Sequence, residues 1–300
     1  MFIIKNKKIF ISISIVLVIL SIASVSIFGL KIGIDFKGGA LTEVVYKDAR
    51  PNQAELNNTF QSFQSVNFGS VSIQPTGDKG YIVKSRDLNE AEHGLLLKIL
   101  SQDGKSILEE KSFNSIGPSV GKELTKKAII AVILVSLAII FFIAYAFRKV
   151  SRPVSSWRYG FIAVVSLLHD VIIPIGLFTF LSHYYGAEVD TLFVVAALTI
   201  LGLSVSDTIV IFDRIRENLK NRVETSFPET VGKSLEQSYV RSICTSLTVI
   251  LVLLSLFFFG PVSTKYFALM LTAGMFFGTY SSIFLASPLL VLVEEWQKKK

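Results

Sequence analysis

Cysteine and histidine are scarce in this sequence. Cys244 is the one cysteine, so the chain forms no intrachain disulfide and holds no cysteine-rich metal site. The three histidines, His93, His169 and His183, are far apart and lack the spacing of metal ligands. We therefore predict no metal site and no catalytic centre built on these residues.

Charged residues are also sparse, at 18% of the chain, whereas hydrophobic residues make up 51%. Six long apolar runs account for this excess, and each reaches the ~20 residues that a helix needs to cross ~30 Å of lipid hydrocarbon. Only helices and closed barrels satisfy their backbone groups inside a bilayer. We therefore predict transmembrane helices at residues 9–30, 128–147, 159–181, 191–212, 239–259 and 266–292.

The first apolar run follows three lysines, Lys5, Lys7 and Lys8, as the core of a secretory signal peptide would. Its apolar stretch is longer than the ~7–15 residues of such a core. We therefore expect an uncleaved membrane anchor.

The distribution of lysine and arginine sets the expected orientation. Basic clusters lie before the first span, between the second and third, between the fourth and fifth, and at the end of the chain. The loop between the third and fourth spans has neither residue, and the loop between the fifth and sixth has only Lys265. The positive-inside rule places both termini in the cytoplasm. Because this topology accounts for the net charge of +7, we expect no nucleic-acid binding.

Residues 31–127 form a polar segment long enough for a small extracytoplasmic domain. Apolar alternation predicts strands at residues 40–46, 71–74, 81–84 and 106–116. A first helix has Leu56, Phe60 and Phe63 on one face, and Asn89 with Glu92 resembles the capping box of a second. The order β-α-β-β-α-β is the ferredoxin-like plan. The predicted fold is a polytopic α-helical membrane protein with six transmembrane helices and one such α+β domain.

Two glycine-rich runs flank this domain. The run GIDFKGG follows the first span, and its paired glycines allow a tight turn or a close backbone approach; the residues of interest are Gly33, Asp35, Phe36, Gly38 and Gly39. The run GPSVGK, residues 117–122, resembles a phosphate-binding loop. Its second glycine comes one residue too early, and Glu123 stands where a serine or threonine would bind Mg²⁺. We therefore expect no nucleotide cofactor.

A histidine–aspartate pair, His169 and Asp170, lies about ten residues into the third span. At ~1.5 Å per residue it is ~15 Å deep, near the bilayer centre. A charge there costs at least ~2.5–3.5 kcal/mol on insertion scales, so the pair must face protein or water. A functional role and a helix–helix hydrogen bond that sets packing are both open interpretations.

The fourth span carries Asp207 among the hydroxyls of Ser204, Ser206 and Thr208. Asp207 lies ~9 Å from the inner end of its span, and Arg241 enters the fifth span from the same side. If these spans are neighbours, the two side chains lie at similar depth. Burial and a nearby cation act in opposite directions on the proton affinity of a carboxylate, so the aspartate would gain and lose a proton as the geometry changes. A static ion pair, or an arginine that extends to the interface, is the alternative.

Two weaker patterns occur in the second half of the chain. Gly274 and Gly278 form a small-xxx-small pair, which indicates a close-packing face for a partner helix. Residues 228–237 have apolar residues at helical spacing, and we expect a short interfacial helix there.

These features together resemble the SecF family, a branch of the RND superfamily. The run GLSVSDTIVIFDRIREN, residues 202–218, closely resembles the family's fourth-span pattern. The six spans, the outer domain, the GIDFKGG run and the histidine–aspartate pair agree with it. Ser206 stands where the family often has asparagine, which keeps a hydrogen-bonding side chain.

The resemblance implies a chain that forms a heterodimer with SecD and acts at the SecYEG protein-export channel of the bacterial cytoplasmic membrane, with YajC as a further partner. It implies that the proton-motive force drives the translocation and release of unfolded exported polypeptides on the outer side. In that scheme Asp207 and Arg241 carry the proton coupling.

Two other functions stay open. Asp170 and Asp207 lie on successive spans, as in an intramembrane aspartyl protease, although their estimated depths differ by ~6 Å. The Gly-Leu-Gly-Asp type of protease signature is absent. A passive structural subunit of a membrane complex, without proton conduction, is also consistent with the sequence.

Overall fold

The computed structural model describes residues 2–62, 66–146 and 154–298. The chain divides into two compact units. The first, called here the helical unit, consists of Met1–Lys31 and Ile130–Lys300, and the second, the sheet unit, is Ile32–Ile129. Each unit has its own hydrophobic core.

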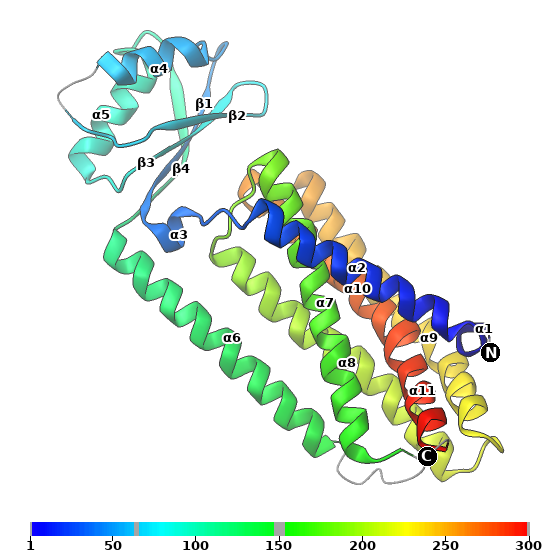
Figure 1. Cartoon of the computed structure of the whole chain (residues 1–300). Helices are drawn as coiled ribbons and strands as arrows, with labels where there is room; N and C mark the ends of the chain where they lie inside the picture. Colours follow the sequence, from blue (N-terminus) through cyan, green and yellow to red (C-terminus); the bar gives the residue numbers. More distant parts are fainter. Residues whose placement is uncertain (1, 63–65, 147–153, 299–300) are drawn as a thin grey trace. The chain divides into compact units, whose positions relative to one another are not determined.

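The helical unit is built from long apolar helices (Figure 1). Within the described residues, six helical stretches are long and apolar enough to cross a membrane, as predicted. The helices are α1 (Phe2–Lys5), α2 (Lys7–Phe28), α6 (Pro118–Ala146, whose first part belongs to the sheet unit), α7 (Ser156–Tyr185), α8 (Thr191–Lys220), α9 (Phe227–Phe259), η1 (Val262–Thr264), α10 (Lys265–Ser281), the π-helical η2 (Ser282–Ala286) and α11 (Ser287–Lys298).

Several helices extend beyond the predicted spans. α6 begins at Pro118, ten residues before the predicted start of the second span, and the last residue of that span, Phe147, lies outside the described residues.

The prediction of a separate interfacial helix at residues 228–237 is wrong, because these residues form the first turns of α9. Ser226 caps this helix and Pro228 stands in its first turn, and the helix continues through Gly232 into the membrane-spanning part.

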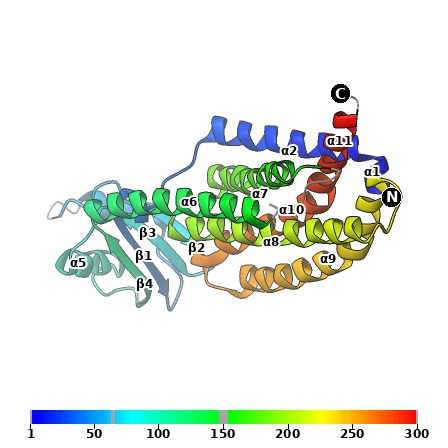
Figure 2. The same cartoon turned by 90° about the horizontal axis from the view of Figure 1, so that it is seen from below.

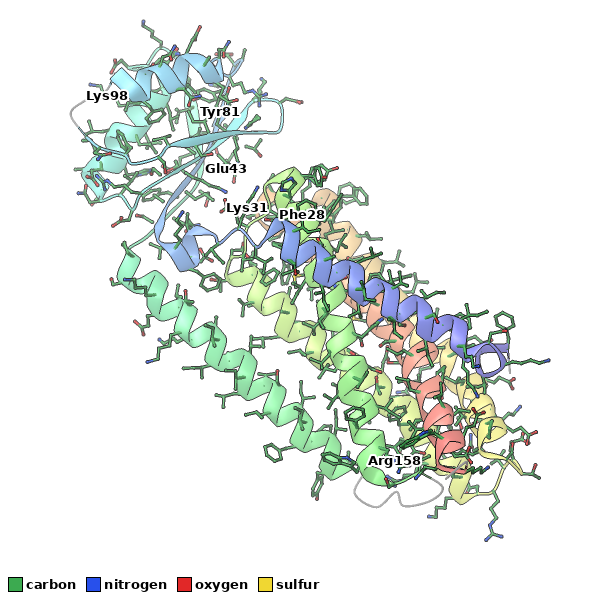
Figure 3. The ribbon with its side chains drawn as sticks, viewed as in Figure 1. Phe28, Lys31, Glu43, Tyr81, Lys98 and Arg158 are labelled. Carbon is green, nitrogen blue, oxygen red and sulfur yellow. The ribbon has the colours of Figure 1, made fainter. Side chains whose placement is uncertain are left out.

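The two ends of the helical unit are fixed by contacts between distant segments. At one end the ring of Phe28 packs against His183 with 4.5 Å between centroids, and the backbone N–H of Val189 donates to the carbonyl of Lys31 at 2.8 Å. At the other end Lys7 pairs with Glu295, and α1 lies beside α11. Figure 3 labels Phe28 and Lys31 at the first end and Arg158 of α7 at the other.

The sheet unit begins with the short helix α3 (Ile34–Lys37). The strands β1 (Gly39–Tyr46), β2 (Ser72–Thr76), β3 (Gly80–Ser85) and β4 (Leu108–Ile116) form an antiparallel sheet in the order β2-β3-β1-β4. The helices α4 (Gln53–Ser62) and α5 (Glu90–Leu100) pack together on one side of it (Figure 1). This is the predicted ferredoxin-like arrangement.

Sequence patterns explain the helices of the sheet unit. Leu56 and Phe60 of α4 are buried in its core, while Phe63 lies outside the described residues. The predicted capping box is present, because the Asn89 side chain accepts from the backbone N–H of Glu92 and the Glu92 carboxylate accepts from that of Asn89. Hydrogen bonds from Arg86 lower the pKa of Glu92 from its ordinary value.

The GIDFKGG run makes close backbone contacts inside the sheet unit. Gly33 precedes α3 and Asp35 lies in its first turn. Gly38 and Gly39 have φ values of +85° and +141°, which side-chain-bearing residues rarely adopt. A Cβ on Gly38 would come within 3.0 Å of the Pro118 Cα atom.

The start of α6 meets the same run. A Cβ on Gly121 of the GPSVGK run would come within 2.9 Å of the carbonyl oxygen of Phe36. The GPSVGK run therefore begins a helix that packs closely on the GIDFKGG run.

Candidate functional site

The third span places a fully buried carboxylate in the helical unit. Asp170 lies on α7 with no exposed surface. Its Oδ2 atom accepts hydrogen bonds from Ser204 of α8 and from Ser281 of α10, the latter at 2.6 Å. The helices α7, α8 and α10 lie side by side in both views (Figures 1 and 2). Asp170 therefore joins three helices through its hydrogen bonds.

His169 completes this cluster from the same helix. Its Nδ1 atom lies 2.8 Å from the Asp170 Oδ1 atom, and its side chain is 3% exposed. Its Nε2 atom is buried and has no hydrogen-bond partner among the described residues. The ring lies nearly parallel to that of Tyr280 of α10, with 6.3 Å between centroids and 18° between planes. One ring nitrogen is therefore engaged with the carboxylate and the other is not.

The fourth span directs its aspartate to a different group of hydroxyls. Asp207 on α8 is partly buried, and its Oδ2 atom accepts from Thr279 of α10 at 3.1 Å. The Thr279 hydroxyl is also bonded to Ser246 of α9. Asp207 therefore belongs to a cluster that joins α8, α9 and α10.

Arg241 does not form an ion pair with Asp207 in this structure. α8 and α9 contact each other, as the prediction required, but the Arg241 side chain is exposed. No nitrogen–oxygen distance of 4.0 Å or less joins these two residues, although they interact electrostatically at longer range. Of the neighbouring hydroxyls, Ser206 is exposed, whereas Thr208 is buried and bonded to Ser282 at 2.9 Å.

Sequence reasoning did not identify the hydroxyls of the last span. Thr279, Ser281 and Ser282 supply partners to Asp207, Asp170 and Thr208 respectively. The signal available was the run TYSS directly after Gly278, four polar or amphipathic residues inside an apolar span.

The small-xxx-small pair explains how these hydroxyls come close. A Cβ on Gly278 would lie 3.5 Å from Ser204 and 3.9 Å from the Asp170 carboxylate, and one on Gly274 would clash with Ile200. The pair is therefore the face on which α10 packs against α8. Among the described residues, no group of three or more His, Cys, Asp or Glu side chains is arranged to hold a metal ion.

Comparisons with known proteins relate the chain to protein export. Residues 97–296 match the family described as "Protein export membrane protein SecD/SecF, C-terminal". The chain is 42% identical to the protein translocase subunit SecF of Thermobaculum terrenum, over 99% of this chain and 94% of that protein. It is 35% identical to SecF of Anaerolinea thermophila, over 98% of this chain and 95% of that protein.

Solved structures give the same result. SecDF of Thermus thermophilus, described as a translocon-associated membrane protein, is 29% identical with a TM-score of 0.80, and the match covers 97% of this chain and 38% of that one. A structure of SecDF in a super-membrane-facing form gives 28% identity and a TM-score of 0.68, over 99% of this chain and 39% of that one. The chain therefore spans about two fifths of the length of the solved SecDF chains.

Proposed function

Because the chain belongs to the SecF family of protein translocase subunits, we propose that it uses the proton-motive force to promote protein export. Together with a SecD subunit it promotes the translocation and release of exported polypeptides on the outer side of the membrane. It acts in the bacterial cytoplasmic membrane with both termini in the cytoplasm. Its partners are SecD, the SecYEG channel, YajC and the unfolded exported chain, and it needs no nucleotide cofactor.

The partner assignment is supported by the SecDF relatives. The matches cover 97% and 99% of this chain, within a longer protein that is called SecDF. The sheet unit, which follows the first span, is the proposed extracytoplasmic part.

The observation that carries the proton-linked role is the position of Asp207. It lies in the interior of an apolar helix, and its carboxylate is held by the neutral hydroxyl of Thr279 and not by a close cation. A charge inside a membrane costs several kcal/mol, and uptake of a proton removes that charge. A hydroxyl donates to the charged form and accepts from the protonated form, so Thr279 serves both states.

The available energy is sufficient for a conformational bias. One proton that moves down 100 mV supplies ~2.3 kcal/mol. That energy shifts a two-state equilibrium by roughly fifty-fold. Arg241 is close enough to act on Asp207 electrostatically, and a small helix movement would change that interaction.

The test compares two aspartates on one helix. Asp207→Asn removes the ionisable group, and Asp213→Asn makes the same change at an exposed position nearer the end of α8. Export rate, membrane level and association with SecD are measured in cells that rely on each variant. We expect export to fall only in Asp207→Asn, with both variants assembled normally. Normal export in Asp207→Asn would refute the proton-linked role.

A passive structural role is the second candidate, and the exposed Arg241 without an ion pair to Asp207 favours it. If the role is passive, Asp207→Leu combined with Arg241→Leu leaves export unchanged, because neither charge is then used. If protons are used, the double variant fails as Asp207→Asn does. The protease alternative has no support, since the relatives are named as translocase subunits and the two aspartates bond to different hydroxyls.

A further inference from the structure

The His169–Asp170 pair is separate from the cluster around Asp207 and has no part in the function proposed above. Its hydrogen bonds go to Ser204 and Ser281, and none of these groups bonds to Thr279 or Ser246 among the described residues. An ionisable pair that is buried inside a membrane span costs free energy, and residues of this kind are usually functional. We propose that His169 and Asp170 form a second proton-binding site of the helical unit, with the Nε2 atom of His169 as the proton acceptor.

The hydrogen bonding assigns the acceptor atom. Asp170 receives two hydroxyl hydrogens on Oδ2. When this carboxylate is ionised, its Oδ1 atom accepts from His169 Nδ1 at 2.8 Å, so the hydrogen of the neutral imidazole lies on Nδ1. A neutral imidazole with its hydrogen on Nδ1 has a free lone pair on Nε2. That atom is the one that is buried without a partner among the described residues. A proton therefore binds there without breaking any hydrogen bond of Asp170.

The charge balance favours such a site. Neutral His169 with ionised Asp170 leaves one net negative charge in a fully buried position. A proton on Nε2 gives an imidazolium–carboxylate pair with no net charge, in direct contact through Nδ1.

The surroundings contain few other ionisable groups. Tyr280 of α10 faces the pair through its ring, and Asp207 of α8 interacts electrostatically with Asp170. α2 also packs against α7, but residues 9–28 carry no charge. η2 has no charged residue, and those of α11 begin only at Glu294. The two carboxylates therefore influence each other, and a proton at one site alters binding at the other.

The pair also lies at an irregular point of the last span. Ser281, which donates to Asp170, is the final residue of α10, and Ser282, bonded to Thr208, is the first residue of the π-helix η2. π-helical turns occur frequently at functional sites. When the pair binds a proton and loses its net charge, the hydrogen bond from Ser281 to Asp170 becomes weaker. Proton binding therefore acts on the junction between α10 and the π-helix η2.

The experiment is a histidine NMR titration of the full-length chain in lipid bilayers with its SecD partner. With ¹⁵N-histidine labelling the chain gives three histidine spin systems, and His93→Gln and His183→Gln assign that of His169. We expect His169 to carry its hydrogen on Nδ1 at high pH and to gain a second one on Nε2 as the pH falls. We expect Asp170→Asn to weaken that proton binding at least tenfold, because the carboxylate partner is lost.

Two further variants keep the result decisive. Ser281→Ala removes one hydrogen-bond donor from Asp170 while both ionisable groups stay, so it strengthens proton binding and serves where Asp170→Asn fails to assemble. Asp207→Asn leaves the titration of His169 in place and alters its midpoint. A single protonation state of His169 from pH 5 to 9, or a titration that neither Asp170→Asn nor Ser281→Ala alters, would overturn the proposal.

The inference depends on the proposed function only for the use of the bound proton. Normal export in Asp207→Asn together with a titrating His169 would refute the function and keep the site. Lost export in Asp207→Asn, together with a His169 whose protonation state does not change with pH, would support the proposed function and refute the second proton-binding site.

Discussion

Gly39 at the start of β1 combines a strained backbone conformation with a close contact, so an added methyl group there should destabilise the sheet unit. Its φ of +141° is rarely adopted by residues with a side chain, and a Cβ there would lie 2.8 Å from the backbone carbonyl oxygen of Ser85. The unfavourable backbone conformation costs about 1–3 kcal/mol, and overpacking against a backbone atom costs about 1–3 kcal/mol more. Gly39→Ala should therefore destabilise the sheet by about 2–6 kcal/mol.

Two matched substitutions separate these contributions. Gly104 also has a positive φ, +88°, but a Cβ there would meet nothing within 4 Å, so Gly104→Ala tests the conformation alone at about 1–2 kcal/mol. Gly94, inside α5, has an ordinary φ and open space around it. Gly94→Ala should stabilise α5 by up to about 1 kcal/mol, because alanine is the better helix former.

Hydrogen exchange with mass spectrometry on the full-length chain in detergent measures these effects locally. Since 1.4 kcal/mol is a factor of ten, exchange in β1 should be at least roughly thirty-fold faster in Gly39→Ala. Exchange in α5 should slow in Gly94→Ala. If Gly39→Ala exchanges no faster than the wild type, neither the close contact with Ser85 nor the backbone argument is correct.

Three further predictions concern the sheet unit. Asn89→Ala removes the capping box of α5 and should cost about 1 kcal/mol, seen as faster hydrogen exchange in the first turn of that helix. Because Arg86 lowers the pKa of Glu92 in the folded state, this pair's contribution to stability is present above the ordinary glutamate pKa and is lost as the pH falls through the lowered value. Calorimetric unfolding between pH 6 and 3 should therefore show a weaker pH dependence in Glu92→Gln. Burial raises the pKa of Tyr46 to about 12, so its contribution is intact below the ordinary value near 10 and is lost as the pH rises to about 12. Tyrosinate absorbance at 295 nm should show that Tyr46→Phe removes one late-titrating group.

Much of the fold could be predicted because its signals are local. Long apolar runs set the number of spans, and strand alternation with a capping box at Asn89 gave the order of the sheet unit. The prediction of a separate helix at residues 228–237 was wrong because it used only the local spacing of apolar residues. That spacing continues into the fifth span, so it does not show where a helix ends.

The candidate site was less predictable because it depends on contacts between distant residues. Ser281 lies 111 positions from Asp170 in the sequence, and only the packing of α10 brings the two together. Gly274 and Gly278 indicated a close-packing face but not which helix covers it. The distance between Asp207 and Arg241 depends on side-chain direction, which similar depth in the membrane does not determine.

The paired glycines at the entrance of the sheet unit have a consequence for its connections. Gly39 pairs with Ile116 in the sheet, and Gly38 lies against Pro118, so the polypeptide enters and leaves the sheet at neighbouring points. A domain whose two ends are adjacent can be inserted or removed without displacing the residues on either side of it. The segment from Gly39 to Gly117 therefore begins and ends at neighbouring points, and a linker of a few residues would join Gly38 to Pro118 in its absence.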